Sequence, residues 1–118
     1  MKKLAFSLLV IMSTALLLSC DPDAASAQQY SVTYRVTSGC SNLGISYVDE
    51  DGTTVILSGQ ASGFEVSFTG ESGDTLSLSG SSGCVVAVFS VTVTIEVDGA
   101  AVAEVTQNNG ASTTYALP

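Results

Sequence analysis

The chain has 118 residues and carries eleven Asp and Glu against three Lys and Arg, with no His and no Trp. From Asp21 onward Arg35 is the only basic residue, so the eleven acids give that part of the chain a net charge of −10. This composition excludes His general bases, Lys Schiff bases and Lys-containing phosphate loops, and the charge excludes nucleic acids as partners. We therefore expect a protein that is not an enzyme and that uses no cofactor.

An export signal is expected over residues 1–19. Lys2 and Lys3 form a basic start, and the apolar stretch that follows is about 15 residues long, short of the roughly 20 that a membrane-spanning helix needs. The stretch "LLSC" at 17–20 then resembles a bacterial lipoprotein lipobox, with a bulky aliphatic residue, a small residue and Cys. This pattern predicts cleavage before Cys20 and acylation of that residue.

A second cleavage site leaves an alternative open. The stretch "ASA" at 25–27 has the small-x-small pattern of ordinary signal peptidase, and cleavage after Ala27 would discard Cys20 and release a secreted protein. In the favoured case residues 20–29 comprise the acylated Cys and a short linker. The lipid would then hold the exported protein on the cell membrane or the outer membrane, with its domain in the periplasm or on the cell surface.

The cysteine count fits the lipid anchor. The chain has three Cys, and if Cys20 takes lipid, Cys40 and Cys84 remain to form a disulfide. Such a bridge closes a loop of about 45 residues, and the chain-entropy model credits it with roughly 4 kcal/mol. The alternative is two unpaired thiols in polar loops. Two Cys without His do not fill a structural zinc site, so we expect no metal there.

Residues 30–118 predict a single all-β domain. Apolar and polar residues alternate with period two, turn signals recur every eight to twelve residues, and no helical face is present. We expect seven or eight strands in an antiparallel β-sandwich. The predicted strands are 30–36, 42–48, 53–59, 63–68, 75–80, 84–97, 100–105 and 112–117.

The apolar run at 84–97 predicts one long strand that breaks near Phe89 or Ser90. Residues 85–89 are almost continuously apolar, which is typical of a central buried strand, whereas residues 91–97 alternate.

The hairpin that follows this run has two alternative registers. A two-residue loop at Asp98 and Gly99 would turn Glu104 into the core. A three-residue loop that includes Ala100 would instead set Val97 opposite Ala101, Ile95 opposite Ala103 and Val93 opposite Val105. We expect the three-residue loop, because it gives a wholly apolar inner face.

The acidic turns offer two interpretations. Asp49 and Asp51, joined by Asp74 from another loop, could supply oxygen ligands to Ca²⁺. The stretch lacks the ligand spacing of an EF-hand, and Asp-Gly and Ser-Gly-Asp also suit tight turns for backbone reasons alone. We favour plain turns and no metal, with calcium at these three residues as the alternative.

The order of three stretches resembles the periplasmic domain of the MmpS family, the mycobacterial small membrane proteins that accompany MmpL transporters. These stretches are "ISYVDEDG" at 45–52, "GDTLSLSG" at 73–80 and "VTVTIEVDGAAVAEV" at 91–105. The resemblance implies an immunoglobulin-like β-sandwich tethered at the outer side of a membrane. It also implies an accessory role beside a lipid or siderophore exporter. The family keeps a spanning anchor, whereas "LLSC" here predicts acylation.

Two classes of function follow. One is a non-catalytic binding or accessory module, anchored through Cys20, whose partner is a membrane transporter or another envelope protein. The alternative is a secreted or surface β-sandwich that binds a ligand or glycan. An exposed apolar patch or an unpaired edge strand would favour the first, and an aromatic-lined cleft or a calcium site would favour the second.

Overall fold

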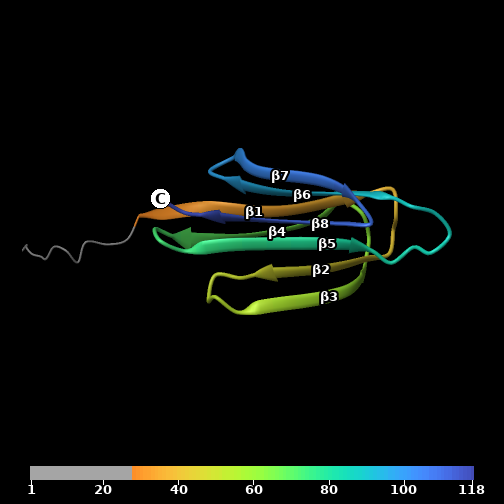
Figure 1. Cartoon of the computed structure of the whole chain (residues 1–118). Coiled ribbons are helices and arrows are strands. Elements are labelled where there is room, and N and C mark those ends of the chain that lie inside the picture. The colour runs from red at the N-terminus through yellow and green to blue at the C-terminus, as the bar shows by residue number, and fades with distance from the viewer. Residues whose placement is uncertain (1–27) are drawn as a thin grey trace, which may run out of the picture.

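The computed structural model describes residues 28–118, which form eight antiparallel strands in two packed sheets (Figure 1). The strands are β1 (Gln29–Ser38), β2 (Leu43–Val48), β3 (Thr54–Gln60), β4 (Phe64–Glu71), β5 (Thr75–Ser82), β6 (Ser90–Val97), β7 (Ala100–Asn108) and β8 (Gly110–Ala116). One sheet has the order β4-β1-β6-β7 and the other has the order β3-β2-β5-β8. The structure confirms the all-β sandwich and is compatible with an immunoglobulin-like assignment. The predicted export signal, Cys20 and Ala27 lie outside the described residues.

The core follows the predicted alternation along β1, a central strand of its sheet. Val32, Tyr34 and Val36 point between the sheets and are fully buried, because successive side chains of a strand point to opposite faces. Leu76 and Leu78 of β5 meet them from the other sheet and are also buried. The sandwich therefore closes over one continuous apolar layer.

Tyr34 links the two sheets through its hydroxyl as well as its ring. The hydroxyl donates to the carbonyl of Val48 at 2.8 Å and accepts from the amide of Ser77 at 3.3 Å. The ring lies edge-on to Tyr47 and Phe68, with centroids 5.5 and 5.2 Å away. Burial raises the pKa of Tyr34 to about 12 because the phenolate would lose its hydration.

The structure differs from the sequence prediction at the start of the sixth strand. The strand expected from residue 84 begins only at Ser90, and residues 85–89 lie in a loop, so the prediction of a buried strand there was wrong. The reason is topological: β5 ends at Ser82 in one sheet and β6 belongs to the other. The apolar run spans this crossing and cannot pair with either sheet along its length.

The β6–β7 hairpin confirms two of the three predicted residue pairs, although its loop differs from the predicted one. Val93 lies opposite Val105 and Ile95 opposite Ala103, as expected, but Val97 lies opposite Ala100 instead of Ala101. The predicted three-residue loop was therefore wrong.

The loop of this hairpin has two residues, Asp98 and Gly99, whose φ angles of 52° and 85° suit a type I′ turn. A bulge at Val102 absorbs the extra residue and restores the apolar inner face.

Gly80 gives a direct test of how closely the sheets pack. A Cβ atom on Gly80 would lie 2.8 Å from Val36 Cγ1 and 3.2 Å from Val91 Cγ1. We expect Gly80→Val to lower the free energy of unfolding by about 1–3 kcal/mol or more through overpacking. The control Ser79→Val adds an aliphatic side chain on the outer face and should stay within about 0.5 kcal/mol of the unsubstituted protein. Urea unfolding measures both, and equal effects would contradict the packing described.

Tyr34 predicts a loss of stability at high pH. The tyrosine of the unfolded chain ionises near its ordinary pKa of 10.0, whereas the folded pKa is about 12. The contribution of Tyr34 is therefore complete below pH 10 and is lost as the pH rises towards 12. We expect the free energy of unfolding to fall across this range and to fall less in Tyr34→Phe. A parallel decline in both proteins, followed by urea unfolding at each pH, would contradict this assignment.

Candidate functional site

The two ends of the sandwich differ in charge. We call the end that holds the start of β1 the N-terminal end, and the opposite end the distal end (Figure 1). The described turns at the N-terminal end all carry acids: 49–53, 71–74 and the Asp98–Gly99 turn. The distal connections carry no charged residue, and they are 39–42, 61–63, 83–89 and Asn109. Removing the distal end from water therefore costs less free energy than removing the N-terminal end, because no charged side chain loses its hydration.

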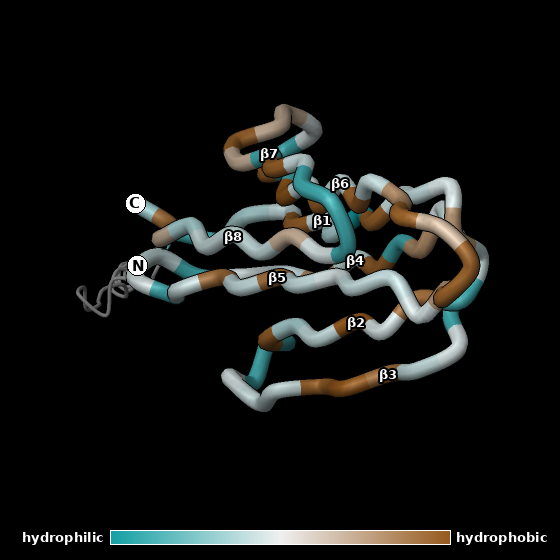
Figure 2. The backbone as a smooth tube through the Cα atoms, turned by 45° about the vertical axis from the view of Figure 1, so that its right-hand side comes forward, coloured by the Kyte–Doolittle hydropathy of each residue, from teal (hydrophilic) through white to brown (hydrophobic). Residues whose placement is uncertain are grey.

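The distal loop, which we define as residues 83–89, exposes apolar side chains at this uncharged end. Val85 is 95% exposed, Val86 is 89% exposed and Val88 is 63% exposed. The loop extends beyond the strand ends in Figure 1 and forms a hydrophobic stretch at the right of Figure 2. Large exposed apolar patches are a feature of many interaction sites.

The start of the distal loop is covalently fixed. Cys84 forms a disulfide with Cys40, with Cα atoms 6.0 Å apart, as the sequence predicted. Beside it the amide of Gly83 donates to the carbonyl of Asn42 at 2.7 Å. Cys40 is buried in the core, so the bridge ties the loop to the 39–42 connection between β1 and β2.

The end of the distal loop is held by Phe89. Its carbonyl accepts from the amide of Asn109 at 2.8 Å, and its ring packs against the core. A Cβ atom on Gly39 would lie 2.9 Å from this ring, so glycine leaves the space that Phe89 occupies. Only residues 85–88 protrude between the two fixed points.

The distal loop offers exposed apolar surface and no catalytic group. It contains no titratable side chain besides the disulfide-bonded Cys84, so it offers neither a nucleophile nor an acid or base. Burial of an exposed valine contributes on the order of 1.5–3 kcal/mol. Burial of these three side chains against an apolar surface would therefore contribute several kcal/mol.

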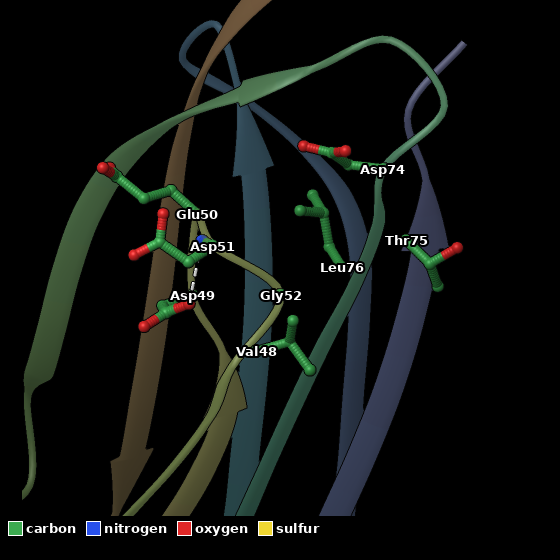
Figure 3. A pocket seen from close by; sticks show the side chains of 8 residues that line it. All are labelled: Val48, Asp49, Glu50, Asp51, Gly52, Asp74, Thr75 and Leu76. Atoms are coloured by element: carbon green, nitrogen blue, oxygen red, sulfur yellow. Dashed lines mark hydrogen bonds between the residues drawn. The ribbon is translucent and has the colours of Figure 1, made fainter.

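The three residues of the calcium alternative line one shallow pocket at the N-terminal end. Asp49, Asp51 and Asp74 line a depression of about 180 Å³, with Asp74 across from the 49–51 turn (Figure 3). Residues 28–118 contain no group of three or more His, Cys, Asp or Glu arranged to hold a metal ion.

Two of these carboxylates instead support turns. Asp49 Oδ1 accepts from the amides of Asp51 and Thr53 at 2.9 and 3.0 Å, and Asp74 Oδ2 accepts from the amide of Glu71 at 2.9 Å. Each of the two carboxylates thereby stabilises the backbone of its own turn.

Arg35 is engaged by two carboxylates on the outer face of the β1 sheet. Its guanidinium lies 2.8 Å from Glu65 Oε2 and also pairs with Glu96. The hydrogen bonds to Glu96 and Glu65 raise the pKa of Arg35, so the side chain stays charged. Both branches of the guanidinium have partners, which leaves little capacity for an anionic ligand.

Comparison with known proteins assigns no family. Neither the protein-family models nor the curated proteins give a match to this chain. The resemblance to the MmpS family therefore stays a prediction. Within residues 28–118 no helix has the length and apolar character needed to cross a membrane.

The sequence prediction identified the cysteine pair but missed the exposure of the distal loop. An available signal was the position of residues 85–88 directly after "SSGC", because Gly83 and Cys84 interrupt the alternation of β5. An apolar run after such an interruption is not a continuation of the preceding strand. By composition alone, residues 85–88 look the same as a buried strand.

The disulfide predicts a specific response to reduction. Its loop spans a sequence separation of 44 residues, which corresponds to roughly 4 kcal/mol of stabilisation in the chain-entropy model. We expect reductant to lower the denaturation midpoint of the unsubstituted protein. The double variant Cys40→Ala/Cys84→Ala should be less stable from the start and insensitive to reductant. A reductant effect of equal size in both proteins would contradict the bridge.

Proposed function

We propose that this protein is a non-catalytic binding module, held at the outer side of a membrane by acylated Cys20, that engages a partner protein through the distal loop. The exposure of Val85, Val86 and Val88 at the end opposite Gln29 carries the proposal. An exposed apolar patch is the feature that distinguishes a protein-binding module from a ligand or glycan binder. A glycan site receives less support, because Tyr34 is fully buried and Tyr47 packs its ring against it.

The charge of the domain favours a protein partner over an anionic lipid surface. Arg35 is the only basic residue after residue 20 and is paired with Glu65 and Glu96. Anionic membranes attract clusters of Lys and Arg, and a chain with a charge of −10 is repelled by them. A projecting, uncharged apolar loop fits a concave apolar pocket on a protein.

The anchor and the distal loop lie at opposite ends of the domain in this proposal. The ten residues of β1 span about 33 Å between the two ends of the domain. The loop would therefore reach a partner some tens of ångströms from the anchoring lipid. A membrane transporter with an extracytoplasmic part fits this reach, and the resemblance to the MmpS family favours that class of partner.

The proposal is tested by placing a photo-reactive amino acid at Val86 in the full chain, expressed in a bacterium that exports and processes it. We expect a discrete cross-linked protein with the probe at Val86 and none with the probe at Thr114, an exposed position on the outer face of β8. The same product at both positions would contradict a binding role for the loop.

A matched variant separates binding from folding. We expect Val85→Ser/Val86→Ser/Val88→Ser to lose the cross-link from a probe at Ala87 by about tenfold or more, as removal of three apolar contacts implies. The unfolding midpoint should change little, because the three side chains are already exposed in the folded protein. Full retention of the cross-link in the triple variant would contradict the apolar contact.

A further inference from the structure

The edge strand β3 presents a second uncharged apolar surface, separate from the distal loop. It pairs with β2 on one side, and no other strand of residues 28–118 pairs with it on the other. Ile56 points outward from this strand and is 78% exposed. Figure 2 shows β3 as a hydrophobic stretch at the margin of its sheet. An edge of this kind offers backbone amides and carbonyls to another strand.

The aliphatic side chains of β3 are incompletely covered on both faces of the sheet. Val55 and Leu57 face the same side as Tyr47 and Ile45, with which they pair across β2. They are only half-buried and lie outside the residues that pack on the core. Together with Ile56 they form three consecutive aliphatic residues that the single domain leaves incompletely covered.

The other described edges carry features that discourage strand addition. Edge strand β4 has Glu65 and Glu71, and β7 has Glu104. Strand β8 lies near β7, the strand that precedes it in the chain. Strand β3 has neither a charged residue nor Pro, and its one bulge, at Ser58 and Gly59, lies beyond the aliphatic residues 55–57.

The sequence of β3 is symmetric in chemistry about Ile56. Thr54 and Ser58 flank Val55 and Leu57, which flank Ile56. A twofold axis through Ile56 would therefore set aliphatic residues opposite aliphatic residues and hydroxyl residues opposite hydroxyl residues. Self-complementarity of this kind is the requirement for an isologous dimer.

We propose that two copies of this chain associate by antiparallel pairing of their β3 strands, centred on Ile56. Ile56 then lies opposite Ile56 of the second copy, and Val55 lies opposite Leu57 of the second copy. The pairing joins the β3-β2-β5-β8 sheets of the two copies into one continuous sheet. It also brings the incompletely covered Val55 and Leu57 side chains of both copies together on one face.

Charge permits this association although each copy is strongly acidic. None of the four strands β3, β2, β5 and β8 contains Asp, Glu, Lys or Arg. The acids of the described strands lie on the other sheet, and the remaining acids of residues 28–118 lie in the turns of the N-terminal end. In an antiparallel pair these acidic ends are at opposite ends of the dimer, so repulsion between them is small.

Neighbouring registers are less favourable. Pairing centred on Leu57 would set Ile56 opposite Ser58 and Val55 opposite Gly59. Pairing centred on Val55 would set Ile56 opposite Thr54 and Leu57 opposite Thr53. Each of these registers places an aliphatic residue beside a small or hydroxyl residue, so only the register centred on Ile56 matches every pair.

The dimer leaves both distal loops exposed and is independent of the proposed function. Antiparallel β3 strands place the two N-terminal ends at opposite ends of the joined sheet. Two copies anchored in one membrane would therefore lie with their strands along its surface. Each loop would project sideways and remain open to a partner protein.

The register is tested by disulfide trapping in the full chain, exported and processed by a bacterial host. Opposed residues of an antiparallel pair have Cα atoms about 4.5–5.5 Å apart, within the range that a disulfide spans. We expect Ile56→Cys to give at least tenfold more covalent dimer on a non-reducing gel than the control Thr114→Cys, which is exposed on the same sheet away from β3. Equal yields, or no dimer from Ile56→Cys, would overturn the proposal.

A second variant tests the association without a cross-link. Ile56→Lys places two like charges side by side at the centre of the interface, and we expect native mass spectrometry of the detergent-solubilised chain to show at least a tenfold loss of dimer. Thr114→Lys should keep the dimer, and both variants should keep the unfolding midpoint. An unsubstituted protein that is monomeric, or Ile56→Lys that remains dimeric, would overturn the proposal. Val85→Ser/Val86→Ser/Val88→Ser should still dimerise, so failure of the loop contact is distinguishable from failure of the dimer.

Discussion

The disulfide between Cys40 and Cys84 is the constraint on which the rest of this domain depends. The chain passes between the two sheets five times, and four of these crossings lie at the distal end. The bridge joins two of the four, and by closing a loop with a sequence separation of 44 residues it lowers the entropy of the unfolded chain. It also sets where the chain leaves β5. The exposure of Val85 and Val86 follows from this geometry, because residues that connect the two sheets form no strand hydrogen bonds with either of them.

The period-two pattern predicted most of the fold, because the alternation of side chains along a strand is a local property. It predicted the buried face of Val32 and Tyr34 correctly, as it did the apposition of Val93 and Val105. It failed at 85–89, where an apolar run has the same appearance in a buried strand and in an exposed crossing. What decides between them is the distant Cys40 and the position of the other sheet. For the same reason, local pattern could not reveal that Ile56 lies on an unpaired edge.

The acidic surfaces of this protein and the two surfaces that we propose as contacts lie in different places. The described acids gather in the N-terminal turns and on the sheet where Arg35 joins Glu65 and Glu96. The distal loop and the β3 edge are both free of charge and expose aliphatic residues. A strongly negative surface keeps a chain soluble, while neutral patches allow contact without the cost of burying an ion. The two proposed contacts occupy the two places where that cost is lowest.

The proposal that this domain is lipid-anchored and carries a Cys40–Cys84 disulfide is tested most directly by the intact mass of the protein from its native membrane fraction. We expect a chain that begins at acylated Cys20 and gains about two daltons on reduction of one disulfide. A chain that begins at Gln28, carries no lipid or gains no mass on reduction would contradict this description of the protein.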